Sequence, residues 1–288
     1  MASDGSVAPA ADKPAALPSV GGFCANCVRA FVREGTPSGE LISLRSDDGS
    51  LAPAYLKRAA GGAAASAPTI LLVTDVFGHA FRNNQVLADE YAARGFNVIM
   101  PDIFRGGAVS GESTAPLMDV ESASFFTKVG TVFSVIPTFV SFLWANGSRK
   151  TVQPRVEALA RSAREKAVEL GGPGAKMGAV GFCFGGPYAV LLAKAGLVDA
   201  CVGVHPSGLA VPADLEGLTA PAFFALSEHD HMITPAVAEK MKAALPAAGI
   251  TWYMGVSHGF AVRGPPSADK MREKCAEDVC AFFKTALA

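Results

Sequence analysis

The 288-residue chain has few charged side chains, and their signs nearly balance. Asp, Glu, Lys and Arg make up 18% of the residues, and the formal net charge is −1 at pH 7. A chain without an excess of positive charge has no general attraction to nucleic acids or to anionic lipids. We therefore expect neither a nucleic-acid-binding protein nor a protein held on membranes by its charge.

A targeting segment is also missing from the sequence. Residues Met1 to Val20 are rich in Ala, Pro, Ser and Asp and lack the basic and apolar regions of a signal peptide. The longest uncharged run, between Lys128 and Arg149, would just span a bilayer, but polar residues, glycines and Pro137 interrupt it. We interpret its apolar part, Val132–Ala145, as a helical segment over a pocket, with contact to a membrane surface as the alternative. A cytoplasmic protein is expected.

The six cysteines do not predict a disulfide framework, because a chain of this length builds its own core and nothing marks it as secreted. Cys24 and Cys27 have the Cys-x-x-Cys spacing of zinc and redox sites, yet no second Cys or His pair stands nearby to complete a tetrahedral site. Three others are interpreted as small hydrophobic residues: Cys201, Cys275 and Cys280. We predict no metal and no cofactor.

Half of the residues are hydrophobic, which is enough apolar surface for a large core. Short apolar runs alternate with helical segments, as is typical of parallel βαβ units. Two earlier strands, Leu41–Arg45 and Ala52–Arg58, surround an Asp-Gly turn. The later strands are expected at Thr69–Thr74, Phe96–Met100, Lys176–Val180, Ala200–Val204, Ala222–Leu226 and Thr251–Met254, and helices at Asn84–Arg94, Thr151–Leu170, Pro235–Leu245 and Ala268–Leu287.

This alternation predicts an α/β fold, with a mostly parallel central sheet and helices on both faces. Residues 1–34 are expected to form an N-terminal extension, and residues 35–288 a single domain. Residues 106–150 interrupt the alternation and contain no strand candidate. We interpret them as a helical insertion near the functional site.

The sequence Gly181-Phe-Cys-Phe-Gly-Gly186 directly follows an expected strand and precedes an expected helix. This is the Gly-x-nucleophile-x-Gly pattern of a sharp strand-to-helix turn, in which the neighbours of the nucleophile must be small. Cys183 would lie near the positive end of the helix, which favours the thiolate form. The alternative is a glycine-rich turn around a buried, inert cysteine.

An acid and then a histidine are expected after such a nucleophile. Asp230 and His258 both follow strand ends, where α/β sheets carry their active sites. Asp230 is preferred to Glu228 as the acid, although the pattern separates the two only weakly. His229 and His231 are alternatives as loop residues or, together with Glu228, as metal ligands.

Four separated motifs occur in the order typical of one known family: Thr74–Gly78, Gly181–Gly186, Glu228–Asp230 and His258–Phe260. Together they resemble the dienelactone hydrolase (carboxymethylenebutenolidase) family, over about Gly35 to Ala288. The resemblance implies the α/β-hydrolase fold. It also implies a hydrolase that cleaves lactones or esters and needs no cofactor.

Residue by residue, the resemblance implies a catalytic triad of Cys183, His258 and Asp230. Bacterial members have a glutamate where this chain has Asp75. That carboxyl group contacts the resting thiol and helps to deprotonate it when substrate binds. Aspartate is one methylene shorter, so Asp75 would act on the thiol through a water molecule.

Further positions are implied in the same way. The N–H groups of Val76 and Phe184 would form the oxyanion hole, and Arg105 and Arg263 would hold a substrate carboxylate. For each arginine the alternative is a solvated surface residue. The segment from Cys24 to Gly39 resembles the leader of fungal-type members.

The chemistry then follows from the residue types. The Cys183 thiolate attacks the carbonyl carbon, and water activated by His258 resolves the thioester. The partner would be a small lactone or ester, with a carboxylate on it if the arginines act as implied. From another class of function, a binding or sensor protein would use Cys183 to report oxidants or electrophiles without turnover.

Overall fold

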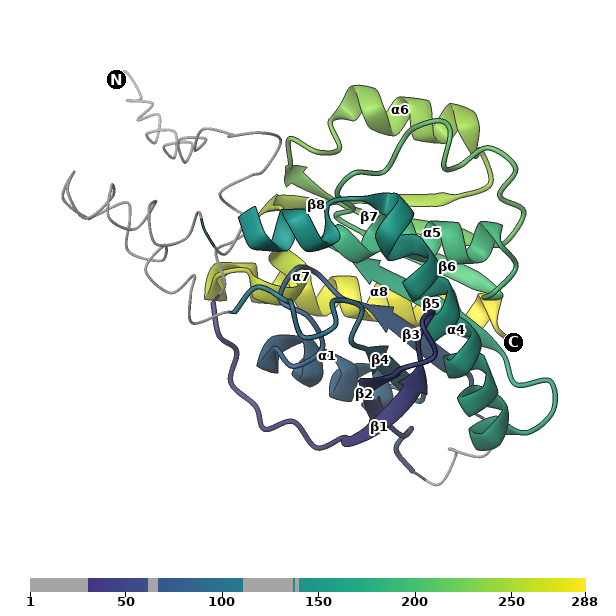
Figure 1. Cartoon of the computed structure of the whole chain (residues 1–288). Coiled ribbons are helices and arrows are strands. Elements are labelled where there is room, and N and C mark those ends of the chain that lie inside the picture. The colour runs from purple at the N-terminus through teal and green to yellow at the C-terminus, as the bar shows by residue number, and fades with distance from the viewer. Residues whose placement is uncertain (1–30, 62–66, 111–136, 138–139) are drawn as a thin grey trace, which may run out of the picture.

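The computed structural model describes residues 31–61, 67–110, 137 and 140–288 (Figure 1). In these residues the strands are β1 (Glu40–Arg45), β2 (Leu51–Lys57), β3 (Thr69–Val73), β4 (Asn97–Pro101), β5 (Met177–Phe182), β6 (Ala200–Val204), β7 (Ala222–His229) and β8 (Gly249–Ser257). The helices are α1 (Arg82–Ala93), α4 (Arg149–Gly171), α5 (Gly186–Lys194), α6 (Pro235–Ala244), α7 (Phe260–Arg263) and α8 (Asp269–Ala286), with 3-10 turns η4 (Cys183–Gly185) and η5 (Pro266–Ala268).

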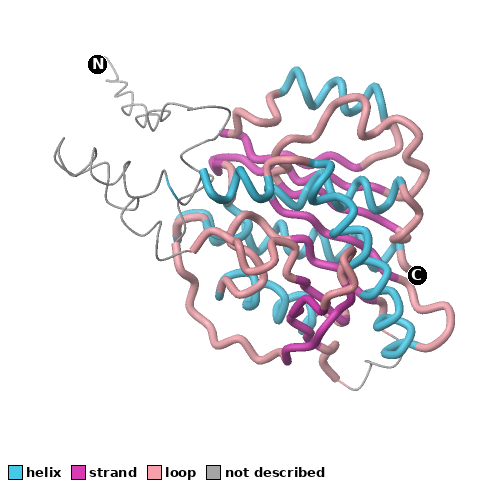
Figure 2. The backbone as a smooth tube through the Cα atoms, viewed as in Figure 1, coloured by secondary structure: helices cyan, strands magenta, loops and turns pink. Residues whose placement is uncertain are grey.

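The strands, drawn in magenta in Figure 2, form one sheet. Their order in it is β1-β2-β4-β3-β5-β6-β7-β8. β1 and β2 pair antiparallel, as do β2 and β4, while every pair from β4 to β8 is parallel. β1 and β2 form a hairpin in which the Gly49 amide donates to the Ser46 carbonyl at 3.1 Å. The mostly parallel α/β architecture predicted from the sequence is therefore confirmed.

Two layers of helices cover the sheet. Residues of α4, α5 and α6 share one buried cluster with one side of the strands, and residues of α1, α7 and α8 share a second cluster with the other side. Within β3, Leu71 and Val73 belong to the first cluster, whereas Ile70 and Leu72 belong to the second. Because side chains alternate along a strand, burial of both faces requires the continuous apolar runs seen in the sequence.

Successive strands are added on opposite sides of β3, so the strand order reverses there. The β3-α1-β4 unit places β4 on one side of β3, and the chain returns through α4 to place β5 on the other side. Ligands of open α/β sheets bind beyond the carboxyl ends of the strands at such a switch point. Asp75 follows β3 and Cys183 follows β5, so both lie at this position.

The expected elements lie within a few residues of the observed ones. The short helix α7 was not expected, because four residues do not produce a detectable periodicity. Residues 140–146 of the expected insertion are helical, while residues 111–136, 138 and 139 lie outside the described part of the chain, as does the extension up to residue 30. The division into an extension, a domain and an insertion stays a prediction. Within the described ranges, no helix has both the length and the apolar character needed to cross a bilayer.

Candidate active site

The turn around Cys183 is sharp and tightly packed. Cys183 has φ 51°, a left-handed conformation that non-glycine residues rarely adopt, and it begins the 3-10 turn between β5 and α5. A Cβ atom on Gly181 would lie 2.1 Å from the Gly185 carbonyl oxygen, and one on Gly185 would lie 2.1 Å from the carbonyl oxygen of Val73. Only glycine fits at these two positions, which explains the Gly-x-Cys-x-Gly pattern.

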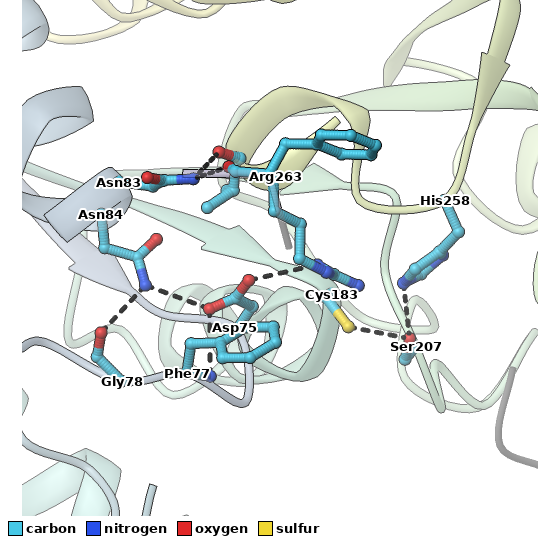
Figure 3. Close-up of polar contacts among 11 residues, drawn as sticks. Asp75, Phe77, Gly78, Asn83, Asn84, Cys183, Ser207, His258 and Arg263 are labelled. Carbon is cyan, nitrogen blue, oxygen red and sulfur yellow. Dashed lines mark hydrogen bonds and ion pairs between the residues drawn. The ribbon is translucent and has the colours of Figure 1, made fainter. Parts of the chain in front are cut away.

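Four side chains form a continuous series of contacts that leads from Cys183 to a buried carboxylate. The Cys183 Sγ atom is 3.4 Å from the Ser207 hydroxyl, and that hydroxyl is 3.2 Å from His258 Nε2 (Figure 3). His258 Nδ1 is 2.8 Å from an Asp230 carboxylate oxygen. The structure thus brings Cys183, His258 and Asp230 to one site and places Ser207 between the first two.

Asp230 is held in its position as the partner of His258. Ser227 donates a hydrogen bond to the same carboxylate oxygen at 3.0 Å, and the Met232 amide donates to the other at 2.8 Å. Burial opposes ionisation of Asp230, but the hydrogen bond and charge of His258, together with the Met232 amide, outweigh it and lower the pKa of Asp230 to about 2. The carboxylate is ionised at neutral pH. It therefore accepts the Nδ1 proton of His258, while the Ser207 hydroxyl lies at Nε2.

Glu228, the alternative acid, lies elsewhere. Its carboxylate accepts a hydrogen bond from the Gly255 amide at 2.7 Å and is 3.8 Å from the exposed His229 ring. His231 is exposed as well. Across the described ranges, no group of three or more His, Cys, Asp or Glu side chains is arranged to hold a metal ion.

Asp75 forms a buried ion pair next to the nucleophile. One carboxylate oxygen is 3.1 Å from Arg263 Nη1, and the other accepts hydrogen bonds from Asn84 Nδ2 at 3.0 Å and the Phe77 amide at 3.2 Å (Figure 3). Burial raises the pKa of Asp75 above its ordinary value, against the opposing charge of Arg263; a negative charge on Cys183 would raise it further. Asp75 and Cys183 are therefore electrostatically coupled.

The two arginines suggested for carboxylate binding differ in their surroundings. Arg263 has only 2% of its surface exposed, and its guanidinium also lies 5.6 Å from the centre of the Phe77 ring. The Arg105 side chain points to the β1-β2 turn, where it pairs with Asp47 at 2.7 Å and Asp48 at 3.0 Å. In this structure carboxylates of the protein itself thus engage both guanidinium groups.

The two residues suggested for the oxyanion hole are neighbours in the chain of Asp75 and Cys183. Val76 is buried and follows Asp75 at the end of β3, and Phe184 follows Cys183 in the chain. The Phe184 ring lies 5.2 Å from that of Phe104, 5.7 Å from that of Phe142 and 5.3 Å from that of Tyr188, measured between ring centres. An aromatic cluster therefore adjoins the nucleophile.

Two residues of the site were not predicted as functional. Ser207 and His205 follow β6, and the His205 ring is fully buried with its centre 4.9 Å from that of His258. Burial and the neighbouring His258 and Arg263 hold the pKa of His205 well below its usual range, so this ring is neutral. The position of both residues just beyond a parallel strand is the same signal that identified Asp230 and His258.

Comparison with known proteins shows which family the chain resembles. Residues 54–287 match the dienelactone hydrolase family. The hydrolase tropI of Talaromyces stipitatus is 31% identical over 259 residues, covering 85% of this chain and 88% of the relative. The carboxymethylenebutenolidase of Pseudomonas putida is 28% identical over 230 residues, covering 77% and 86%. A dienelactone hydrolase structure from Klebsiella pneumoniae superposes with a TM-score of 0.64 at 19% identity, covering 85% of this chain and 98% of its own, which supports the fold alone. The chain therefore belongs to the dienelactone hydrolase family, whose members are ester and lactone hydrolases with the α/β-hydrolase fold.

Proposed function

We propose that the protein hydrolyses a small lactone or ester through a Cys183-His258-Asp230 triad and a thioester intermediate. The observation that carries the proposal is the unbroken run of contacts from the Cys183 thiol to the Asp230 carboxylate at the switch point of the sheet. The thiol is at a sharp turn with strained backbone, the position of the attacking group in this kind of turn, and it is buried with 1% of the residue exposed.

In the first half of the reaction the thiolate attacks the carbonyl carbon. The carbonyl π electrons move to oxygen, and the backbone N–H groups of Val76 and Phe184 are the proposed donors to that oxyanion. Each well-placed donor of this kind lowers the barrier by about 3 kcal/mol. When the tetrahedral intermediate collapses, the alkoxide leaves with the proton held on His258, and the acyl group stays on sulfur.

In the second half, His258 Nε2 takes a proton from water as the water attacks the thioester. Collapse releases the carboxylic acid and the thiolate. Asp230 stabilises the positive imidazole ring in both halves and keeps Nε2 directed at the reacting groups. The buried carboxylate of Asp230 has no other charged partner among the described residues, which suits this role.

Asp75 and Arg263 are the groups that would respond to substrate. A substrate carboxylate that binds Arg263 competes with Asp75 for the same guanidinium. Release of Asp75 from the ion pair would make its carboxylate a stronger base next to the thiol, because the opposing charge no longer stabilises its ionised form. This supports a substrate that carries its own carboxylate, as the resemblance implies.

The test is hydrolysis of a panel of small esters and lactones, with and without a carboxylate. We expect wild-type turnover, no turnover by Cys183→Ala above background, and normal turnover by Cys201→Ala, which removes a buried thiol inside β6. Rapid acid quenching should trap an acylated wild-type protein, seen as a mass increase on the peptide that contains Cys183. Turnover of the wild type no faster than that of Cys183→Ala on every substrate would contradict the proposal and favour the sensor alternative.

Substitutions at Asp230 and Glu228 form a matched test of which carboxylate is the acid of the triad. Asp230→Asn should lower kcat by about 10³ to 10⁴, because the amide favours the wrong tautomer of the histidine. Glu228→Gln alters a carboxylate that contacts only the Gly255 amide and the exposed His229 ring, and it should leave kcat nearly unchanged. Equal losses in the two variants would contradict the assignment of Asp230.

A further inference from the structure

The Ser207 hydroxyl lies between the thiol and the imidazole of the proposed triad. It is 3.4 Å from Cys183 Sγ and 3.2 Å from His258 Nε2 (Figure 3). We propose that Ser207 relays the proton of the Cys183 thiol to His258, so that it is a further catalytic residue. The inference rests on the proposed function, since it concerns activation of the same nucleophile.

The backbone fixes this hydroxyl relative to the nucleophile. The Ser207 amide donates a hydrogen bond to the Cys183 carbonyl at 2.9 Å. Pro206 packs against the start of α5, where a Cβ atom on Gly186 would lie 2.5 Å from the Pro206 side chain. The backbones of Ser207 and Cys183 are therefore held together, which keeps their side chains within contact distance.

The same segment also positions the histidine. His205 has φ 35°, donates its amide hydrogen bond to Ala225 at 2.8 Å and packs its ring on that of His258. A strained backbone conformation at a buried residue persists only where the surrounding structure holds it. Here the strained backbone at His205 directs the chain so that the Ser207 hydroxyl lies between the Cys183 sulfur and the His258 imidazole.

The direction of the relay follows from the protonation of the histidine. In the proposed resting state His258 is neutral and its Nδ1–H donates to Asp230 at 2.8 Å, so Nε2 accepts a hydrogen bond and Ser207 donates it. A hydroxyl that donates to nitrogen keeps its lone pairs for the thiol proton. The S–H bond then breaks as a new O–H bond forms, while the original O–H proton transfers to Nε2. The products are the Cys183 thiolate, a protonated His258 and an intact Ser207 hydroxyl.

Other charges around this path come from several elements. Among the described residues, Asp75 follows β3, Arg263 belongs to α7, His205 follows β6, and Asp230 follows β7. The Ser207 hydroxyl contacts both Cys183 and His258, and a hydroxyl oxygen is a hydrogen-bond donor and acceptor at once.

The test compares Ser207→Ala with Ser207→Thr, which keeps the hydroxyl. We expect kcat/KM to fall by about 100-fold in Ser207→Ala, the lower end of the usual contribution of positioned proton transfer. Ser207→Thr should recover most of the loss. The wild type should show a curved dependence of the acylation rate on the fraction of D₂O, as expected when two protons move together. A merely structural role would not produce this curvature.

A second measurement does not need turnover. The rate of alkylation of Cys183 by iodoacetamide, followed on its own peptide by mass spectrometry across pH, reports the thiolate fraction. Ser207→Ala loses the hydrogen bond to sulfur, so the inflection of its alkylation rate against pH should move upward by about one pH unit. At lower pH this corresponds to alkylation about tenfold slower than in the wild type. Ser207→Thr should keep the wild-type profile.

The outcomes separate the two proposals. An alkylation profile and kcat/KM of Ser207→Ala that match the wild type would overturn the relay while the hydrolase proposal stands. No turnover of any substrate by the wild type would overturn the proposed function, and the alkylation profiles would still decide whether Ser207 activates the thiol.

Discussion

At the scale of single residues, the site depends on how buried charges are compensated. Asp230 and Asp75 are both buried carboxylates, but they have opposite shifts of pKa. Asp230 is stabilised in its ionised form by His258 and by the Met232 amide. For Asp75, burial outweighs the charge of Arg263. In the proposed reaction the first carboxylate stays charged, while the second, whose ionised form burial disfavours, is the one that takes up a proton.

The Asp75-Arg263 pair leads to a prediction about stability. Asp75→Leu should lower the free energy of unfolding by about 3 to 5 kcal/mol, because it leaves the buried Arg263 guanidinium without its carboxylate. The double variant Asp75→Leu with Arg263→Met should recover much of this loss, since no uncompensated charge remains. Urea denaturation of both variants measures the difference.

A surface pair provides the control. Arg105→Met removes a guanidinium whose side chain is 41% exposed and whose partners are Asp47 and Asp48, so its unfolding midpoint should change far less. A double variant no more stable than Asp75→Leu alone would argue against charge burial as the cause.

At the scale of secondary-structure elements, the turn between β5 and α5 positions Cys183. Its geometry depends on contact between this turn and the end of β3, since Gly185 packs directly against the Val73 backbone. The same contact places Asp75 beside Cys183. The packing that holds the turn against β3 therefore also brings the residues of the site together.

Gly185→Ala tests this dependence. The added methyl group would meet backbone atoms of Val73 and Thr74 that cannot rotate away, so we expect a loss of about 3 kcal/mol in stability together with loss of esterase activity. Gly196→Ala is the comparison, because that glycine at φ 69° has open space around it and costs only about 1 to 2 kcal/mol of backbone strain. Thermal melts and turnover of the two variants should differ clearly, and equal behaviour would show that the close approach is not required.

At the scale of the whole molecule, acid stability should reflect carboxylates whose pKa is lowered in the folded state. Asp199 is one of them: its burial raises the pKa, but the Met177 amide and Arg164 outweigh that effect. Asp47 behaves similarly, with Ser46 and Arg105 outweighing its burial. Asp230 is the largest case, with a pKa lowered from 3.8 to about 2.

A carboxyl group whose pKa is lowered by folding stabilises the folded state at pH values above its pKa in the unfolded chain. This stabilisation is lost as the pH falls through its pKa in the folded state. We therefore expect the melting temperature to fall between about pH 4 and pH 2, with Asp230 contributing about 2 kcal/mol of that change. Asp230→Asn should reduce the slope of the melting temperature in this range. The raised pKa of Asp75 acts in the opposite sense, because its contribution weakens as pH rises. A slope that Asp230→Asn leaves unchanged would contradict the assignment of this contribution.

Much of the architecture was predictable because it rests on local patterns. Apolar runs without alternation indicate strands that are buried on both faces, and the runs at β3, β5 and β6 are of this kind. The Gly-x-Cys-x-Gly pattern indicates a turn because only glycine fits beside backbone atoms at such short distances. Strand ends then indicated where Asp230 and His258 would lie.

The sequence by itself determined the α/β class and the turn that carries Cys183, because each follows from local periodicity or steric demand. The roles of Cys183, Asp230 and His258 as nucleophile, acid and base stay a prediction. Tertiary structure decided which groups meet across the sheet. Glu228 and Asp230 are two positions apart, yet only Asp230 reaches His258, and Arg263 meets Asp75 although 188 positions separate them. Ser207 lies between Cys183 and His258 because β6, which precedes it, pairs with β5. Hydrogen bonds are short and directional, so their partners depend on side-chain positions that residue spacing does not specify.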